Sequence, residues 1–394
     1  DFCLSRGLGD VYKRQGVMGR SSYKRLGDYI QPVDIRNKDN AVDKLVGLTI
    51  DKAFIDSVAN TIGTDLSKYK IIEAEQFACS LMQVSRDGKM PIAMYAGGEE
   101  AILSPAYSMF EVIDKSELLP SYLMMCFRRS EFDREASFYA VGGVRGSLLW
   151  EDFLDFRLPI PDIEEQREIV AQYEAITRRI ALNERICANL EETAQALYNK
   201  MFVQGIDPDN LPDGWRMGAI EEFGEVVTGK TPSSRYPEHF GDYMPFVTPA
   251  EFQGEKFIRT AERKLSIEGV KALEKKVIRE GDVMVTCIGS DMGKAAISDT
   301  EVVTNQQINS IRTYDNTFSE YLYYTLKGMK EILMGLGSGS STMPLLSKRS
   351  FEVVEVLYPP TDLIQCFSQT VKPLSAMVKT RSKENDVLRE VLSL

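Results

Sequence analysis

The residues of this chain whose types could support chemistry are few and are widely spaced. His239 is the only histidine among 394 residues, which argues against a Ser-His-Asp triad and against a histidine-rich zinc site. We therefore expect no catalytic residues and no metal site. The cysteines are scattered without a CxxC pair, as is typical of free thiols in a reducing compartment. They are Cys3, Cys79, Cys126, Cys187, Cys287 and Cys366.

One segment matches a nucleotide-binding pattern. GEVVTGKT, Gly224–Thr231, satisfies the P-loop pattern GxxxxGK[ST]. A P-loop needs a buried strand before it and a helix that begins at its lysine. Here the preceding segment is polar, and Pro232 and Pro237 would break a helix after Lys230. The pattern match alone leaves a P-loop nucleotide-binding protein as one alternative. The other is a polar loop, Lys230–Tyr236, whose two cations, three hydroxyls and aromatic ring suit contacts to phosphates and bases.

A second polar run, TNQQINS at Thr304–Ser310, is rich in amides that can bond adenine edges in the major groove. We expect a strand here, in which Asn305, Gln307 and Asn309 share one face opposite Gln306. An exposed polar strand face without a ligand is the simpler interpretation of the same pattern.

One long segment near the middle of the chain sets the positions of these residues. Residues 162–202 contain no Gly or Pro and keep an apolar seam in 3/4 steps for more than four heptads. This pattern predicts a coiled-coil helix of roughly 60 Å that needs a partner helix. Asp162 is placed as its N-cap, and Asn183 is a polar seam residue of the kind that fixes register. The seam comprises Ile169, Tyr173, Ile176, Ile180, Asn183, Cys187, Leu190, Ala194, Leu197 and Met201.

Segments on the two sides of this helix repeat in the same order. KIIEAEQF at 70–77 matches KVIREGDV at 276–283, and LPIPDIEEQ at 158–166 matches LYPPTDLIQ at 357–365. A constant order with loops of unequal length indicates two copies of one β-rich domain, at a period too long for a solenoid.

The second copy also ends in a predicted helix. Its seam runs in 4/3 steps and is polar near its middle, so we expect it to pair antiparallel with the first helix. Pro373 should kink this helix or delay its regular start. The chain stops at Leu394 in phase and without a C-cap, as in a truncated helix. The seam comprises Phe367, Val371, Leu374, Val378, Arg381, Asn385, Leu388 and Leu392.

At 394 residues the chain is too long for one ordinary core and suits two domains or more. The composition, 43% hydrophobic and 27% charged, is typical of a soluble globular protein. No apolar run approaches the ~18 residues that span a bilayer, and no signal peptide is evident, so we expect a cytoplasmic protein. The net charge of −11 argues against a uniformly basic chain. Any surface for nucleic acid must therefore be local.

The predicted fold class is α+β: two β-rich domains in pseudo-twofold repeat, separated by two long antiparallel coiled-coil helices. We place the domains at residues 21–161 and 204–360, and the helices at 162–203 and 361–394. Residues 1–20 begin with a segment that lacks periodicity and resembles translated cloning sequence. We expect them to form a disordered, non-native tail.

The order of four motifs, together with the duplication, carries a resemblance to a known family. The motifs are LSPAYSMFEV in the first copy, TGKTPSS and TNQQINSI in the second, and LPIPDIEEQREIV at the start of the central helix. Over about residues 21–394 the chain resembles the specificity subunits of type I restriction-modification systems.

The resemblance implies two target-recognition domains that each read one half of a bipartite, asymmetric DNA site. The helices would act as a ruler and as the docking surface for two methyltransferase subunits, which bind S-adenosylmethionine and methylate adenine. Motor-nuclease subunits would join the complex, while this chain would bind no cofactor and would not itself be an enzyme. Half-sites one turn apart lie roughly 34–36 Å from centre to centre, a separation that such a helix pair can hold.

Two sets of candidate site residues follow from these motifs. The candidate DNA-contacting residues are loop cations, hydroxyls, amides and tyrosines: Arg36, Lys38, Arg86, Lys89, Tyr107, Arg145, Lys230, Thr231, Ser233, Arg235, Tyr236, Lys294, Asn305, Gln306, Gln307, Thr342 and Lys348. The candidate coiled-coil and docking residues are Tyr173, Ile176, Ile180, Asn183, Leu190, Leu197, Val371, Leu374, Val378 and Leu388. Besides the P-loop protein, a coiled-coil scaffold that does not bind DNA is the remaining alternative.

Overall fold

A computed structural model describes residues 23–57, 64–82, 84–140, 146–337 and 344–393. The predicted tail at 1–20 and the predicted contact residues Arg145 and Thr342 lie outside these ranges. The chain divides into two compact units, residues 1–179 with 389–394, and residues 180–388. The long central helix contributes its first part to one unit and the rest to the other.

The first sheet domain, residues 23–159, is built around a four-stranded antiparallel sheet of order β2-β9-β6-β7. Phe77 and Phe110 stack on it with ring centroids 4.9 Å apart, and Phe127 of α3 meets both rings edge-on. The strands are β1 Tyr23–Arg25, β2 Ile30–Pro32, β3 Val46–Leu48, β4 Phe54–Asp56, β5 Lys70–Ile72, β6 Phe77–Cys79, β7 Ile92–Met94, β8 Ala101–Leu103, β9 Ser108–Val112 and β10 Arg157–Pro159. The helices are α2 Val84–Asp87, α3 Pro120–Arg128, α4 Ser130–Ala140 and α5 Trp150–Leu154.

Two segments of this domain are divided by local breaks. Residues 101–112 form two strands, β8 and β9, because a turn closes between them where Tyr107 N donates to Ser104 O at 3.2 Å. Helix α3 ends before Arg129, whose backbone is extended, and α4 begins at the next residue.

The second sheet domain, residues 216–358, holds a five-stranded sheet of order β12-β21-β18-β19-β15 and a second of order β13-β16-β14-β20-β17. Its strands are β11 Arg216–Ala219, β12 Gly224–Thr228, β13 Phe240–Gly241, β14 Met244–Val247, β15 Phe257–Ile258, β16 Lys264–Leu265, β17 Val277–Ile278, β18 Val283–Thr286, β19 Ala295–Ser298, β20 Val302–Thr304, β21 Ile308–Thr313 and β22 Glu355–Tyr358. Its helices are α7 Ile267–Ala272, α8 Phe318–Gly328, α9 Lys330–Gly337 and α10 Lys348–Glu352.

The two sheet domains share one strand topology. The order β12-β21-β18-β19 repeats β2-β9-β6-β7, and the pairs β11-β22 and β17-β20 repeat β1-β10 and β5-β8. A matching carboxylate precedes the first long helix of each domain: Asp114 accepts from Ser116 N, and Asp315 accepts from Thr317 N, both at 2.8 Å. The α+β class and the duplication predicted from sequence are thereby confirmed.

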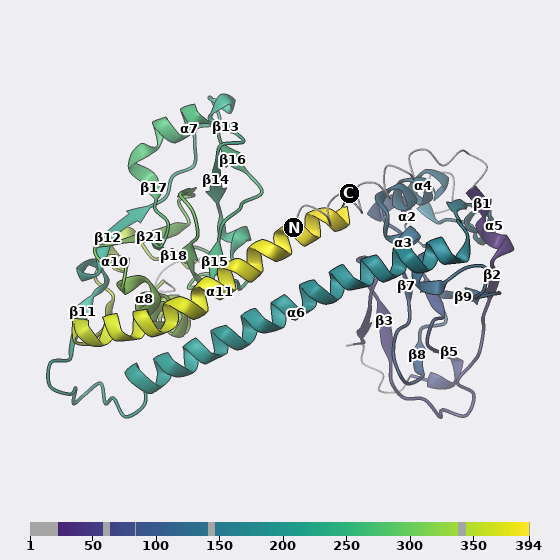
Figure 1. The fold of residues 1–394 in the computed structure, drawn as a ribbon, viewed down its shortest axis with the longest axis horizontal. Coiled ribbons are helices and arrows are strands. Elements are labelled where there is room, and N and C mark those ends of the chain that lie inside the picture. The colour runs from purple at the N-terminus through teal and green to yellow at the C-terminus, as the bar shows by residue number, and fades with distance from the viewer. Residues whose placement is uncertain (1–22, 58–63, 83, 141–145, 338–343, 394) are drawn as a thin grey trace. The chain divides into compact units, whose positions relative to one another are not determined.

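Each domain closes on a strand, β10 or β22, that leads into a long helix. These are α6 Ile163–Phe202 and α11 Thr361–Ser393. Asp162 caps α6 as predicted, since its Oδ1 accepts from Glu165 N at 3.0 Å. Figure 1 shows α11 alongside the later half of α6. The helices run antiparallel there, because Cys187 Sγ lies 3.8 Å from Val378 O while Tyr198 packs on Phe367.

Of the two effects predicted for Pro373, a kink or a delayed start, the delayed start is wrong, because α11 is continuous from Thr361 through Pro373. Pro373 lies on an exposed face of the helix. The carbonyl of Gln369, which the proline leaves without its usual donor, is therefore close to solvent. None of the helices among the described residues combines the length and the apolar character needed to cross a bilayer.

Candidate nucleic-acid interface

In the second sheet domain, the loop 229–236 and the turn 305–307 lie against each other. Gly229 N donates to Ile308 O at 3.1 Å, and Lys230 N donates to Thr304 O at 2.8 Å. The Thr231 hydroxyl donates to Gln306 Oε1 at 2.7 Å. The structure therefore brings together two motifs that are more than seventy residues apart in the chain.

Gly229 is the residue that allows this close approach. A Cβ at this position would lie 2.2 Å from the carbonyl oxygen of Asn305 and 2.3 Å from that of Thr304. Both oxygens belong to backbone that is held in place by its own hydrogen bonds, so a side chain would force the loop away from the turn.

The side chains that this surface presents to solvent are of types that can contact nucleic acid. Lys230, Thr231, Ser233 and Arg235 are all exposed. Tyr236 is half exposed and stacks on His239 with ring centroids 5.2 Å apart. Two cations can meet phosphates, while hydroxyls and a flat ring can meet sugars and bases.

The predicted strand over TNQQINS is wrong in its middle. β20 ends at Thr304 and β21 begins at Ile308, so residues 305–307 form a turn. The turn is stabilised by Asn305, whose Oδ1 accepts from Gln307 N at 3.0 Å and whose Nδ2 donates to Gln307 Oε1 at 2.9 Å. A side-chain bond to the backbone two residues on is what ends the strand here.

This turn reverses the predicted roles of the amides. Asn305 and Asn309 are buried, and Asn309 is bonded to Thr228 at 2.6 Å. Their side chains therefore support the loop and do not face a ligand, and Gln307 is engaged by Asn305. Gln306, which was placed on the opposite face in the predicted strand, is the exposed amide.

The P-loop pattern has no P-loop geometry. Gly224–Thr228 is strand β12, paired along its length with β21. The next helical turn after Lys230 is Pro237–His239, so no helix begins at the lysine. Without a helix N-terminus facing the loop, the backbone cannot cradle phosphates in the P-loop manner.

Two other predicted contact residues of this domain take part in local ion pairs. Lys294 Nζ donates to Phe252 O at 3.1 Å and lies 3.2 Å from Asp291. Lys348 begins α10 and pairs with Glu352 one turn later at 3.3 Å. Both lysines thus already have internal partners.

In the first sheet domain, Lys70 links two of the predicted contact residues. Arg36 bonds the carboxylate of Asp34 and donates to Lys68 O. Lys70 Nζ donates to Tyr107 O at 2.8 Å and lies 3.7 Å from Asp34. The Arg36 guanidinium, aided by Lys70, holds the pKa of Asp34 below its ordinary value. Lys70 was not among the predicted residues, although it opens the repeated KIIEAEQF motif.

The remaining predicted cations that the structure describes in this domain lie on its surface. Lys38 is exposed. Arg86 in α2 pairs with its neighbour Asp87 at 2.7 Å, and Lys89 pairs with Asp51 at 3.4 Å. Exposed pairs of this kind are weak, so these cations can exchange their partners for phosphates.

A cavity of about 540 Å³ in the same domain has cations that sequence reasoning missed. It is lined by Lys44, Lys52 and Arg128 together with the rings of Phe54 and Tyr95. Lys52 is buried and forms an ion pair with Asp133 at 2.8 Å, and burial lowers the pKa of its ammonium. A single lysine in an otherwise ordinary segment gave no pattern that could have identified it.

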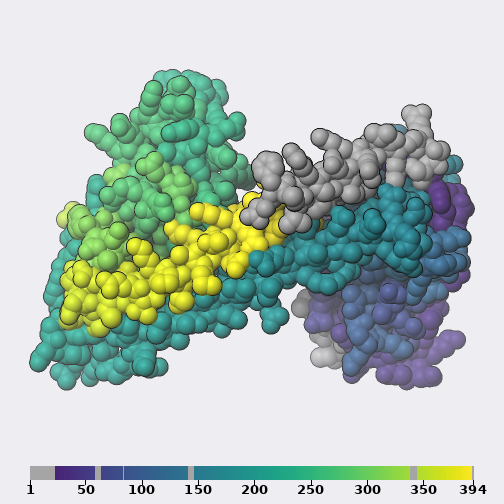
Figure 2. All heavy atoms as spheres, in the orientation of Figure 1, coloured from purple at the N-terminus to yellow at the C-terminus, as the bar shows by residue number. Residues whose placement is uncertain are grey.

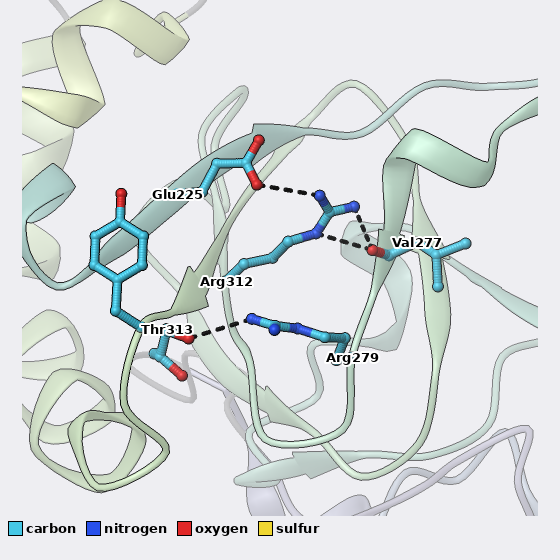
Figure 3. A pocket seen from close by; sticks show the side chains of 6 residues that line it. Glu225, Val277, Arg279, Arg312 and Thr313 are labelled. Atoms are coloured by element: carbon cyan, nitrogen blue, oxygen red, sulfur yellow. Dashed lines mark hydrogen bonds and ion pairs between the residues drawn. The ribbon is translucent and has the colours of Figure 1, made fainter.

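A cavity of about 470 Å³ in the second sheet domain contains two arginines (Figure 3). Arg312 donates through Nε to Val277 O at 3.0 Å and lies 3.3 Å from Glu225. Arg279 donates to Thr313 O at 3.2 Å. The Arg312 guanidinium is thus largely engaged by backbone carbonyls, whereas Arg279, which is 57% exposed in its side chain, also pairs with the buried Asp282 at 3.3 Å.

The first sheet domain has a related contact between the corresponding strands, with a different charge. Strand pairing places Glu111 where the second domain has Arg312. Glu111 accepts from Gln31 at 2.9 Å and from Gln76 at 3.1 Å. The contact between these two strands is therefore repeated, while its charges and the other bonds of Glu111 and Arg312 differ.

The helix pair is organised by two buried amides. Asn183 Nδ2 donates to Asn385 Oδ1 at 2.9 Å, and Asn385 Nδ2 donates to Ile180 O at 3.3 Å. Val371 and Val378 are buried on the same face of α11, as predicted. The predicted polar seam positions of the two helices therefore meet.

The predicted seam of α6 is too narrow at its C-terminal end. Tyr198 and Phe202 are buried there, whereas the predicted Leu197 is only partly buried. The buried stripe widens because α6 packs against α8 as well as α11: Tyr198 bonds Thr325 at 3.0 Å and packs on Phe367. In the other unit, Tyr173 accepts from Arg128 at 2.9 Å. The predicted Ile176, Ile180, Leu190, Leu374 and Leu388 are partly buried.

Comparison with known proteins shows that this chain is similar to type I restriction enzyme specificity subunits. Residues 212–388 match the family described as type I restriction modification DNA specificity domain. The chain is 33% identical over 212 residues to the type I restriction enzyme HindI specificity subunit of Haemophilus influenzae, covering 52% of this chain and 46% of that protein. It is 29% identical over 189 residues to the MjaIX specificity subunit of Methanocaldococcus jannaschii, covering 47% and 43%. These matches thus span about half the length of those two curated relatives.

A solved structure shares the fold. The crystal structure of a type I restriction-modification system S subunit from M. genitalium superposes with a TM-score of 0.61 over 94% of each chain, at 10% identity. At this identity the likeness concerns the fold alone.

Proposed function

We propose that this chain reads a bipartite, asymmetric DNA site for a restriction-modification complex. Residues 212–388 of the chain match the type I restriction modification DNA specificity domain, and the chain is similar to type I specificity subunits. The observation that carries the proposal is the duplicated strand order, β2-β9-β6-β7 and β12-β21-β18-β19, with a long helix after each copy. Two domains of one topology suit two half-sites.

The asymmetry of the site follows from the surfaces of the two domains. The second domain presents the loop Lys230–Tyr236 beside Gln306. The first domain has Arg36 and Tyr107 linked through Lys70. Since these side chains differ in type and spacing, the two domains should read different bases. Partner subunits would supply much of the backbone contact, because the chain carries a net charge of −11.

The helix pair would dock two adenine methyltransferase subunits, which a motor-nuclease subunit would join. S-adenosylmethionine would bind in the methyltransferase, and this chain would supply sequence recognition without catalysis. The half-exposed residues along α6 and α11 suit such docking, since a polar and apolar mixture is typical of interfaces that are not permanently buried.

Sequencing of methylated bases tests the proposal directly. The chain is expressed together with its cognate methyltransferase in cells that lack other adenine methylation. We expect a gapped, two-part adenine motif. A continuous motif, or no motif with a soluble complex, would count against it. Replacing residues 21–161 with those of a relative should change one half of the motif and leave the other intact.

The same complex separates the alternatives. A scaffold that does not bind DNA would co-purify with partners and show no DNA affinity. A P-loop protein would bind nucleotide as an isolated chain and lose that binding in Lys230→Ala. We expect no nucleotide binding at millimolar concentration.

A further inference from the structure

The edge of the second sheet domain is attached to α11 by charged residues. Arg259, directly after β15, donates through Nε to Asp299 Oδ2 at 2.7 Å and through Nη1 to Asp386 Oδ2 at 2.6 Å. Asp299, directly after β19, is 1% exposed in its side chain. Its other oxygen lies 2.7 Å from the ammonium of Lys379. We call Arg259, Asp299, Lys379 and Asp386 the clasp.

The clasp uses a face of α11 different from the one that meets α6. Lys379 and Asp386 are two turns apart on the helix and point toward the sheet domain. Asn385, the neighbour of Asp386, points toward Asn183 of α6. Figure 2 shows α11, in yellow, between the green residues of the sheet domain and the teal residues of α6. Two successive residues of α11 therefore contact different elements: Asn385 contacts α6, and Asp386 contacts the second sheet domain.

A buried lysine forms a second attachment of the same domain. The ammonium of Lys256, 0% exposed in its side chain, lies 2.7 Å from Glu320 and 3.5 Å from Glu191 of α6. It also donates to Ser375 of α11 at 2.9 Å and to Tyr324 at 3.0 Å. One side chain from the sheet edge thus contacts both long helices.

These contacts are suited to fixing an orientation. Charged groups lose hydration when they are buried, so an ion pair stabilises less than its attraction suggests, whereas its geometry is strict. An apolar contact would hold the domain with less angular definition. Among the described residues, the sheet of the first domain ends at β7 and has no strand that corresponds to β15. The repeated fold therefore does not itself require the clasp.

We propose that the clasp of Arg259, Asp299, Lys379 and Asp386 fixes the orientation of the second sheet domain on the helix pair and thereby sets the spacer length between the two DNA half-sites. This inference rests on the proposed function. It assigns to these residues a positioning role, distinct from the contacts of the loop 229–236 that would read the bases.

The test uses two conservative variants of the full chain. Asp386→Asn removes the carboxylate charge of α11 that pairs with Arg259, while Asp299 keeps its own ion pairs. Arg259→Gln removes the same ion pair by neutralising the partner in the sheet domain. The matched control is Arg279→Gln, because Arg279 also pairs with a buried aspartate, Asp282, within the sheet domain. Each variant is expressed with the methyltransferase, and methylated motifs are sequenced.

We expect both clasp variants to methylate the same two half-sites with the parent spacer and, in addition, with spacers one base pair shorter or longer. We expect Arg279→Gln to keep the parent spacer alone. An unchanged spacer in both clasp variants, with parental melting temperatures, would overturn the inference. A parent chain that gives no two-part motif would instead overturn the proposed function.

If the parent chain gives no two-part motif, a distance measurement without DNA still tests whether the clasp fixes the orientation of the second sheet domain. Spin labels are attached at exposed Glu192 of α6 and Glu268 of α7, each replaced by cysteine, with Cys3, Cys187 and Cys366 changed to serine. We expect a narrow distance distribution in the parent and in Arg279→Gln, and a broader one in both clasp variants. The effects of Arg259→Gln and Asp386→Asn on the width should not simply add in the double variant, since both changes break the Arg259–Asp386 contact. Equal widths in all variants would contradict a positioning role.

Discussion

Asn183 of α6 donates its side-chain amide to Asn385 of α11 at 2.9 Å, and both side chains are buried. Asn183 Oδ1 meets no donor in the part of the chain that the structure describes. A pair of buried amides that is only partly bonded stabilises a coiled coil less than apolar residues would. It does, however, permit one alignment of the two helices, since any shift separates the amides.

The first prediction concerns this pair. We expect the double variant Asn183→Leu/Asn385→Leu to raise the stability by about 1 kcal/mol, because two buried amides become apolar contacts. Asn183→Leu alone should lower it by about 1–3 kcal/mol, because it leaves Asn385 without its donor. Chemical denaturation measures both. A single variant as stable as the double would show that the amides are not coupled.

The second prediction concerns Gly229. Gly229→Ala places a Cβ within 2.3 Å of two backbone oxygens, so we expect a loss of about 1–3 kcal/mol, the usual effect of overpacking, and weaker DNA binding. Gly328→Ala in α8 is the control, since its Cβ would meet no atom within 4 Å. It should leave the melting temperature unchanged or raise it slightly. Parental DNA binding in Gly229→Ala would contradict the contribution of this loop.

The third prediction separates affinity from specificity on the same surface. Lys230→Ala and Arg235→Ala should weaken DNA binding for all sequences and lower the salt dependence by about one charge each. Gln306→Ala should relax one base position by about 1–3 kcal/mol. Binding titrations at several salt concentrations and on DNA with single base changes measure the two effects. A uniform loss of affinity in Gln306→Ala would show that it does not read a base.

The fourth prediction concerns pH. Burial, together with the nearby charge of Glu320, raises the pKa of Glu191 despite the ammonium groups of Lys256 and Lys327. A group whose pKa is raised on folding stabilises the protein below its unfolded pKa, and this contribution is lost as the pH rises through the folded value. The ionised Glu191 therefore disfavours folding at neutral pH.

We accordingly expect Glu191→Gln to raise the melting temperature at pH 7 by up to about 2–4 °C, the effect of about 1 kcal/mol in a domain of about 150–250 residues. The gain should shrink as the pH falls toward the unfolded pKa of glutamate. Glu192→Gln, at an exposed neighbouring position on α6, should change neither the melting temperature at pH 7 nor its dependence on pH. A lower melting temperature at pH 7 in Glu191→Gln would mean that the Lys256 contact outweighs burial.

The sequence by itself determined the features that depend on residues near one another in the chain. The 3/4 spacing predicted α6 and α11, Asp162 was identified as the N-cap, and Asn183 and Asn385 were placed at the polar centres of their seams. The repeated order of motifs predicted the duplicated sheet topology. Helix periodicity, capping and repeats are local regularities, so they can be seen before the chain is folded.

Only the tertiary structure decided which side chains are exposed to solvent and which are engaged in contacts within the protein. Asn305 and Gln306 are adjacent and chemically alike, yet a turn buries the first and exposes the second. Arg259 and Asp386 are separated by 127 residues and meet only because β15 packs on α11. Lys256 lies in a segment without any marked pattern and becomes the contact of both long helices. Burial and ion pairing depend on which surfaces meet after folding, and spacing along the chain does not contain that information.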